Sequence, residues 1–469
     1  MLLTVDIGTT NFKSALWDYD GNLLSYSAFP MTENEESRAQ WTRAFENCLE
    51  KIKSDNKNLK SVQAVVISGN GPTLVPVTGD APNAGSPVES ENPRFWLDRK
   101  ALKFQEEVSR VVGGFVDAGF FLPKILRIKR EEFNLYKKTK YFVGCPEYLA
   151  LTLTGEARSV FPSDGFDRWF WNDDVLAKLD LDKSKFPPFI RPGEQFGTIL
   201  PRVASSLGFS GNVPVISGGP DFFVSILGSG ATEPSFACDR TGSSEGINLC
   251  VQKRVDDARL MSYGHPVKPY WNLSGIINTT GRAIQWFNDL FEIADFNQFI
   301  SLAKESAAGA GGLVFLPYLA GERAPLWNPS ISGLWRGLSL SCGKKEFASS
   351  ILEGICLAVK DVISVMEETG EKVNHLRVTG GMAGISFLNQ LKSDITGKPV
   401  YEPRVKNGEL LGCAIIGSCF LGKYSCYKDA CGELVKIEKR FEPNIKNKDF
   451  YDALFKKYLD CQKTALNFG

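Results

Sequence analysis

Short hydrophobic runs separated by turn residues dominate the beginning of the chain. Runs of this kind, bounded by glycine, asparagine or aspartate, are typical of β-strands. They occupy residues 2–5, 12–18 and 23–29, and an Asp-Gly pair supplies a hairpin turn between the second and third. Residues 44–52 then repeat hydrophobic side chains at helical spacing. The pattern therefore predicts three strands followed by an amphipathic helix.

Farther along, apolar strands end in glycine-rich turns and lead into helices. Strand 213–217 is followed by the turn G-G-P-D and a helix over 222–227, and strand 376–379 by G-G-M-A-G and a helix over 386–396. Alternating strands and helices of this kind predict an α/β fold. The same reasoning predicts further strands at 62–67, 236–239 and 247–251, and further helices at 347–369, 409–421 and 444–468.

Two similar segments, about half a chain apart, indicate a two-domain protein. Residues 6–10 read D-I-G-T-T and residues 239–244 read D-R-T-G-S-S, each between two predicted strands. Self-similarity of this kind suggests a repeated architecture. Single cores stop growing at roughly 250–300 residues, and the chain has 469. We expect domains at residues 1–235 and 236–469.

Charge and cysteine content restrict the class of protein. Lys+Arg and Asp+Glu both number 54, so no net charge favours nucleic acid as a partner. No apolar run approaches the ~20 residues of a membrane span, and no signal-peptide pattern opens the chain. The 11 cysteines are scattered through apolar segments, which is typical of a reduced, cytoplasmic protein. Whether the chain forms a homodimer stays open.

Several enzyme classes are disfavoured by what the sequence lacks. It has two histidines and no C-x-x-C, so a structural zinc site and a Ser-His-Asp hydrolase are both poor candidates. No G-x-x-x-x-G-K-[S/T] occurs, and no G-x-G-x-x-G follows the first strand. These absences disfavour both a P-loop kinase and a Rossmann enzyme.

The first turn has two interpretations. It can be a plain hairpin in which Gly8 supplies an unusual backbone angle. It can also be a phosphate site, in which Gly8 lets the backbone approach the anion and Lys13 neutralises charge. In that case Asp6 would hold Mg²⁺ directly or through water, because Mg²⁺ prefers carboxylate oxygen and keeps several waters. The side chains that would donate to the phosphate are those of Thr9, Thr10 and Asn11.

Two later turns have similar alternatives. Asp221 follows two glycines at the end of a strand and before a helix, where open α/β sheets place catalytic groups. It can equally be a helix N-cap. The glycines at 380–384 can open space for a flat base or ribose, or merely permit tight packing.

These motifs together resemble the FGGY carbohydrate kinases of the actin/hexokinase-like ATPase superfamily. The order and spacing match the family from residue 1 to about 422. The matching segments are D-I-G-T-T at 6–10, W-L-D-R-K at 96–100, L-T-L-T-G-E at 151–156, G-G-P-D at 218–221, L-P-Y-L-A-G-E-R-A-P-L-W at 316–327, and the glycine-rich segment at 380–400.

The resemblance implies a fold and an activity. The fold would be two ribonuclease H-like domains with a cleft between them, the first mainly binding the sugar and the second mainly ATP. The activity would be Mg-ATP-dependent phosphorylation of a sugar or polyol hydroxyl, with Asp221 as the general base. By the same resemblance, the second phosphate turn would comprise Gly242, Ser243 and Ser244, and the adenosine pocket Gly380, Gly381, Met382 and Ala383.

The residues expected to bind the sugar differ from those of familiar members of the family. Asn70 stands in a segment where xylulose kinases have Q-M-H-G, Lys100 replaces an arginine, and two phenylalanines follow Asp221 where glycerol kinases have Gln-Gln. These changes predict a more apolar pocket and a ketose, deoxy sugar or polyol as substrate. Candidate sugar contacts are Asn70, Trp96, Asp98 and Asp221, and Trp96 can equally be a core residue.

Glu245 is the least expected residue of the second phosphate turn. Many family members have glycine there, and an acid beside a polyphosphate is unfavourable unless it points away or helps to hold the metal. Together with the altered sugar segment, Glu245 keeps an alternative open. In that alternative, the chain is a catalytically inactive sugar- or nucleotide-binding regulator on the same fold.

Overall fold

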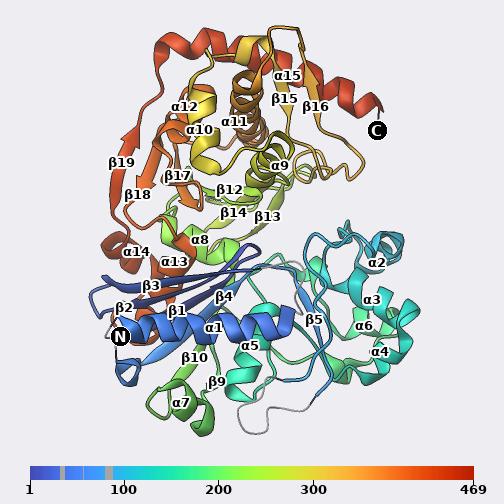
Figure 1. Cartoon of the computed structure of the whole chain (residues 1–469). Coiled ribbons are helices and arrows are strands. Elements are labelled where there is room, and N and C mark those ends of the chain that lie inside the picture. Colours follow the sequence, from blue (N-terminus) through green and yellow to red (C-terminus); the bar gives the residue numbers. More distant parts are fainter. Residues whose placement is uncertain (32–36, 56–57, 80–87, 469) are drawn as a thin grey trace. The chain divides into compact units, whose positions relative to one another are not determined.

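The computed structural model of the chain describes residues 1–31, 37–55, 58–79 and 88–468 (Figure 1). Contacts between residues divide the chain into two compact units. The first comprises residues 1–227 and 409–434, and the second comprises residues 228–408 and 435–469. The chain thus returns to the first unit over residues 409–434. The sequence pattern does not predict this return.

A six-stranded mixed sheet forms the centre of the first unit. Its order is β3-β2-β1-β4-β10-β9, with β1, β4 and β10 mutually parallel and β2, β3 and β9 antiparallel to their neighbours. The strands are β1 (Leu2–Ile7), β2 (Asn11–Trp17), β3 (Leu23–Pro30), β4 (Ala64–Gly69), β9 (Gln195–Thr198) and β10 (Pro214–Pro220). The first three confirm the predicted meander, each within two residues of the expected bounds.

Helices and two small sheets complete the first unit. The helices are α1 (Ser37–Ser54), α2 (Gln105–Val112), α3 (Phe121–Glu131), α4 (Phe133–Lys138), α5 (Cys145–Thr154), α6 (Asp173–Lys178), α7 (Pro201–Leu207), α8 (Asp221–Ser229), α13 (Gly408–Phe420) and α14 (Tyr427–Leu434). The small sheets pair β5 (Leu74–Val77) with β6 (Tyr141–Gly144), and β7 (Ser159–Val160) with β8 (Phe189–Ile190).

Helix α13 packs on the main sheet of the first unit although it comes from late in the sequence. A Cβ added at Gly417 would lie 2.9 Å from Leu2 and Val66 side-chain carbons, and one at Gly412 would lie 1.9 Å from the Val224 carbonyl oxygen of α8. Only glycine allows such close approach. The small residues of the predicted helix 409–421 are therefore packing residues.

The second unit contains a seven-stranded mixed sheet. Its order is β13-β14-β12-β11-β17-β18-β19, and β11, β17 and β18 are parallel. The strands are β11 (Phe236–Thr241), β12 (Glu245–Val251), β13 (Met261–Gly264), β14 (Trp271–Ile277), β17 (His375–Gly380), β18 (Val400–Pro403) and β19 (Ile437–Phe441), with β15 (Val314–Leu316) and β16 (Leu334–Arg336) as a separate pair.

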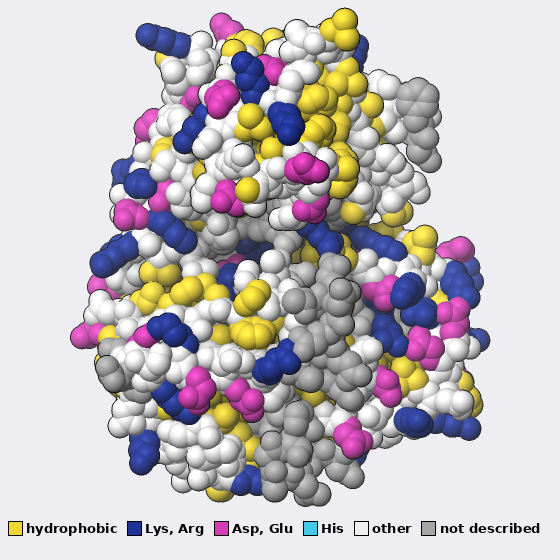
Figure 2. Space-filling model, viewed as in Figure 1, with side chains coloured by type: hydrophobic (Ala, Val, Ile, Leu, Met, Phe, Trp, Pro, Cys, Tyr) yellow, Lys and Arg dark blue, Asp and Glu magenta, His cyan; other side chains and the backbone are white. Residues whose placement is uncertain are grey.

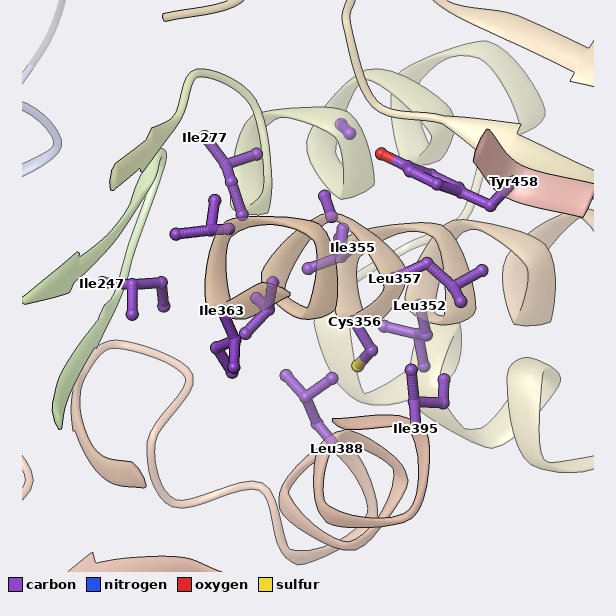
Figure 3. Close-up of a cluster of buried hydrophobic side chains, with 14 of the residues drawn as sticks. Ile247, Ile277, Leu352, Ile355, Cys356, Leu357, Ile363, Leu388, Ile395 and Tyr458 are labelled. Carbon is purple, nitrogen blue, oxygen red and sulfur yellow. The ribbon is translucent and has the colours of Figure 1, made fainter. Parts of the chain in front are cut away.

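A long buried helix, α11 (Lys344–Glu368), lies at the centre of the second unit's core. Figure 3 shows its Leu352, Ile355 and Ile363 between sheet residues such as Ile247 and side chains of α12 such as Leu388. This continuous apolar cluster supplies the main stabilisation of the unit. The remaining helices are α9 (Gly281–Phe291), α10 (Phe296–Lys304), α12 (Ser386–Thr396) and α15 (Lys448–Phe468).

Surface charge follows the composition. On the face drawn in Figure 2, Lys and Arg side chains alternate with Asp and Glu and form no extended area of one sign. Within the described ranges, every helix is too short or too polar to cross a bilayer.

Candidate functional site

Three parallel strands of the first unit end at the same edge of the sheet, and each end carries a candidate residue. Ile7 of β1 pairs with Gly69 of β4, and Gly69 pairs with Pro220 of β10. Asp6 therefore lies at this edge with Asn70 and Asp221, the residues that follow Gly69 and Pro220. Carboxyl ends of parallel strands are where open α/β sheets bind ligands. The sheet register thus brings together residues that lie more than 200 positions apart.

The β1–β2 turn is tight and requires glycine. The amide of Gly8 donates to the carbonyl of Asn11 at 3.1 Å. A Cβ at Gly8 would lie only 2.5 Å from that same carbonyl oxygen. Thr9 and Asn11 are half-buried and Thr10 is exposed. The turn therefore has partly accessible hydroxyl and amide groups on a rigid hairpin.

Asp6 and Lys13 face each other across this hairpin. They are register partners on β1 and β2, and Nζ of Lys13 lies 3.8 Å from Oδ2 of Asp6. The side chain of Asp6 is 4% exposed and that of Lys13 is 17% exposed. Among the described residues, no group of three or more His, Cys, Asp or Glu side chains is placed to hold a metal ion by itself.

Asp221 is the first residue of α8 and is half-buried. Its Oδ1 accepts a hydrogen bond of 2.7 Å from the Phe222 amide, and its carbonyl accepts one of 2.7 Å from the Ser225 hydroxyl. An ionised carboxylate is stabilised at a helix N-terminus by the amides and the helix dipole. The arrangement is compatible with both the capping and the catalytic interpretation of Asp221.

Asn70 is more deeply buried than a sugar contact requires. It is 5% exposed, its Nδ2 donates to the Ile7 carbonyl at 2.9 Å, and its Oδ1 accepts from the Thr73 hydroxyl. These bonds tie the end of β4 to the end of β1. Its expected contact with the sugar stays a prediction.

Trp96 joins the two ligand sites that the sequence predicts in the first unit. Its indole Nε1 donates to Oγ1 of Thr9 at 3.0 Å. Asp98 lies two residues farther on and is half-buried, and its Oδ1 accepts from the Lys100 amide at 2.8 Å. The predicted sugar segment thus contacts the predicted phosphate turn directly.

The two phenylalanines after Asp221 have different environments. Phe223 is 5% exposed and belongs to the interior. Phe222 is half-buried, and its ring stacks on that of Phe166 with a centroid separation of 5.6 Å and an interplanar angle of 14°. The residue that follows the candidate base is therefore part of an aromatic pair, in a segment where the sequence predicts a more apolar pocket.

In the second unit, the β11–β12 turn lies against the start of α9. The Gly242 carbonyl accepts from the Gly281 amide at 3.0 Å, and the Ser243 carbonyl accepts from the Thr280 amide at 3.1 Å. Sequence reasoning did not single out Thr280 and Gly281, although small residues immediately before a helical pattern are a start signal that could have located them. Gly242, Ser243 and Ser244 are all half-buried.

The glycine loop after β17 lies beside this turn. Gly380 pairs with Thr241 across parallel strands, has φ +96°, and would bring a Cβ within 2.2 Å of the Thr241 carbonyl oxygen. Gly381 is exposed, whereas Met382 and Ala383 are 6% and 0% exposed and belong to the apolar core. The side chains of Met382 and Ala383 thus pack inward, and an adenosine contact from them would have to come from the backbone.

Glu245 points into the interior of the second unit. Its side chain is 0% exposed, and its Oε1 accepts from Nζ of Lys392 at 2.5 Å. The same ammonium donates to Oδ2 of the equally buried Asp239. Burial and the neighbouring Asp239 raise the pKa of Glu245 well above its usual range, with Lys392 opposing. Glu245 is therefore a member of a buried ion cluster.

Solved structures of sugar kinases share the architecture of this chain. The crystal structure of a ligand-bound xylulose kinase from Lactobacillus acidophilus superposes with a TM-score of 0.82 at 23% identity, covering 99% of this chain and 98% of that one. The expected two-domain, actin-like ATPase fold is thereby confirmed. The chain thus has the two-domain fold of that structure.

Family models define the class further. The model of the FGGY family of carbohydrate kinases matches with its N-terminal domain at residues 1–228 and with its C-terminal domain at residues 241–420. The chain belongs to the FGGY family of carbohydrate kinases, and the expected family and enzyme class are confirmed.

Curated relatives extend over nearly the whole chain. The xylulose kinase of Staphylococcus epidermidis is 27% identical over 483 residues, covering 98% of this chain and 95% of the relative. The gluconokinase of Bacillus subtilis is 24% identical over 506 residues, covering 99% and 96%.

Proposed function

We propose that this kinase transfers the γ-phosphate of Mg-ATP to a hydroxyl of a ketose, a deoxy sugar or a related polyol, with Asp221 as the general base. The observation that carries the proposal is the alignment of Asp6, Asn70 and Asp221 at one edge of the parallel strands. A carboxylate at this edge can accept the hydroxyl proton as the oxygen attacks phosphorus. Phosphoryl transfer otherwise depends mainly on positioning and charge neutralisation.

Each unit, taken by itself, has a turn that is a candidate for contact with the nucleotide. In the first unit, Gly8, Thr9, Thr10 and Asn11 would donate to phosphate, and Lys13 would neutralise its charge. In the second unit, the turn at Gly242, Ser243 and Ser244 would hold phosphate, and the loop at residues 380–383 would present backbone and open space to the adenosine.

Magnesium fits the residues present without a dedicated protein cage. Mg²⁺ in kinases is usually held by one or two carboxylates together with substrate phosphates and water. Asp6, nearly buried beside Gly8, is the carboxylate that would hold it. When bound, the ion would neutralise negative charge that develops during phosphoryl transfer.

The substrate class follows from the sugar side of the first unit. The relatives include proteins named xylulose kinase and gluconokinase. Trp96 and Asp98 are proposed sugar contacts, and the ring of Phe222, stacked on Phe166, adds an apolar surface. An apolar ring packs well against C–H groups and forms no hydrogen bond with a hydroxyl, which favours a sugar with a reduced or partly deoxygenated face.

We place the enzyme in the cytoplasm, because its 11 cysteines are scattered through apolar segments as in reduced proteins.

Two features of the sequence favour the inactive-regulator alternative, and the structure weakens one of them. That feature is Glu245, because an acid beside the phosphates would repel them. Its carboxyl is buried and bonded to Lys392 instead. The altered sugar segment remains the only feature that favours a regulator, and it is equally compatible with a changed substrate.

The test is ADP release from MgATP against D-xylulose, D-gluconate, further ketoses, deoxy sugars, polyols and glycerol. A strong response to one acceptor supports the proposal and identifies the substrate. ATP binding by calorimetry without turnover on any acceptor would favour the regulator. If MgATP does not bind at all, both turns are structural and the proposal fails.

A further inference from the structure

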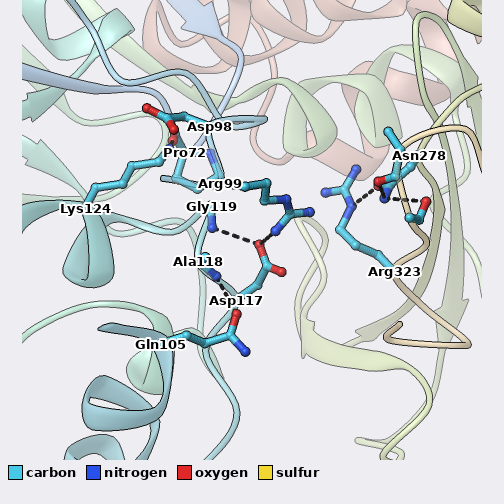
Figure 4. A network of polar contacts seen from close by, with 12 residues as sticks. Pro72, Asp98, Arg99, Gln105, Asp117, Ala118, Gly119, Lys124, Asn278 and Arg323 are labelled. Carbon is cyan, nitrogen blue, oxygen red and sulfur yellow. Dashed lines mark hydrogen bonds and ion pairs between the residues drawn. The ribbon is translucent and has the colours of Figure 1, made fainter. Parts of the chain in front are cut away.

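Lys124 of α3 is a buried cation, and its hydrogen-bond partners among the described residues are main-chain carbonyls. It is 2% exposed, and its Nζ donates to the carbonyl oxygens of Pro72 at 2.8 Å, Phe95 at 2.7 Å and Arg94 at 3.2 Å. Figure 4 shows the side chain extending from its helix toward Pro72. Burying an ammonium costs free energy unless its donors are satisfied, and here all three N–H groups have an acceptor.

The three carbonyls belong to the two segments that carry the proposed sugar contacts. Pro72 lies two residues after Asn70, and Phe95 immediately precedes Trp96. The segments also pair with each other, since the amides of Leu74 and Arg94 exchange hydrogen bonds of 2.9 and 2.8 Å. Lys124 therefore ties both segments to one helix at the point where they meet.

The charged groups around Lys124 have opposing effects on its pKa. Asp98 and Asp117 face it and favour its ammonium form, whereas Arg99 disfavours it. Arg99 in turn donates to Oδ1 of Asp117, as the dashed line in Figure 4 marks. Burial is the largest influence and lowers the pKa of Lys124 to about 7. A neutral amine has two N–H groups for three carbonyls, so deprotonation would loosen the attachment.

We propose that Lys124 is a positioning residue that sets the geometry of the sugar-binding segments, and that its protonation controls sugar affinity. The kinetic part of this inference rests on the proposed function. Its structural part, the order of the two segments, can be measured without any substrate. The role is indirect, because Lys124 acts through the backbone of Pro72, Arg94 and Phe95.

The first experiment compares Lys124→Met with the wild-type protein and with Lys129→Met. Lys129 lies on the same helix and bonds to the exposed Asp180. With D-xylulose as acceptor, we expect KM for the sugar to rise roughly 10–100-fold in Lys124→Met, because bonds to a charged donor are lost. The turnover number should change much less, and Lys129→Met should match wild type. An unchanged KM, or a loss in kcat without a rise in KM, would overturn the inference.

The second experiment needs no sugar. Hydrogen exchange of the Leu74 and Arg94 amides, corrected for intrinsic rates, should be at least about tenfold faster in Lys124→Met than in Lys129→Met, since these amides open with the segments. Equal protection would contradict the inference even if the enzyme uses another sugar. Altered exchange without D-xylulose turnover would support the positioning role and place the failure in the proposed substrate.

The third experiment uses the wild-type protein and is independent of whether Lys124→Met folds. Protection of the same two amides should fall as the pH is raised from 6 to 8.5, through the range in which Lys124 loses its proton. The KM for an accepted sugar should rise over the same range. Constant protection across this pH range would exclude control by Lys124 protonation.

Discussion

The indole Nε1 of Trp96 donates a hydrogen bond of 3.0 Å to Oγ1 of Thr9, although 87 positions separate the two residues. Thr9 lies in the proposed phosphate turn and Trp96 in the proposed sugar segment. The sequence allows Trp96 to be a core residue or a sugar contact. The bond gives it a third role, which is to link the two proposed ligand segments directly.

We expect Trp96→Phe and Thr9→Val to be coupled. Each change removes one partner of the bond while keeping most of the side-chain volume. A double-mutant cycle on kcat/KM should give a coupling free energy of about 0.5–1.5 kcal/mol, the usual net value of such a bond. Strict additivity of the two single effects would contradict a functional link between the segments.

Asp221→Asn should fold normally, bind MgATP and lose most of its turnover. Removing a general base typically costs about 10²–10⁴-fold in rate, while the amide can still accept from the Phe222 amide that Asp221 binds. Steady-state kinetics and calorimetry with MgATP measure the two properties. Asp173→Asn, at an exposed ion pair of the same unit, is the matched control. Turnover close to wild type would remove Asp221 from the mechanism.

Lys392→Met should strongly destabilise the second unit. It leaves the buried carboxyl groups of Asp239 and Glu245 without their cation, and breaking a buried ion pair typically costs about 3–5 kcal/mol. Urea denaturation measures the free energy of unfolding. The control is Lys398→Met, which removes a partly exposed pair with Glu367 and should cost at most about 1 kcal/mol. Equal losses of unfolding free energy in both variants would mean that the buried ion cluster contributes little to stability.

Glu353→Gln should change how stability depends on pH. Burial raises the pKa of Glu353 to about 7, so between about pH 4.5 and 7 the folded chain keeps a proton that the unfolded chain releases. This contribution to the unfolding free energy is full below about pH 4.5 and is lost as the pH rises through 7, by roughly 3–4 kcal/mol in all.

The glutamine variant removes that titration but keeps an acceptor for the Gly309 amide that Glu353 binds. Its unfolding free energy should therefore fall less between pH 5 and 8 than that of the wild type. Urea titrations at several pH values measure the difference, with Glu305→Gln at an exposed position as control. Parallel pH curves for wild type and Glu353→Gln would show that Glu353 does not hold the proton.

Much of the proposed location of the candidate site follows from local pattern. A strand that ends in D-I-G-T-T, and another that ends in G-G-P-D before a helix, can be recognised without coordinates, because turn chemistry and hydrophobic period are local properties. The direction of individual side chains could not be recognised in this way. Met382 and Ala383 share a loop with the exposed Gly381 but pack into the core, and the Asn70 side chain bonds to the end of β1. Such choices depend on neighbours distant in sequence.

The sequence by itself determined the order of the elements, the two glycine–hydroxyl turns and the family of kinases. Those features depend on residue types at fixed spacing along the chain. Tertiary structure decided that residues 409–434 return to the first unit, and that Glu245 turns from the proposed phosphate turn toward Lys392 and Asp239. The physical reason is the same in both cases. A helix of small residues and a buried acid are each stable only against a particular partner, and only the fold supplies those partners.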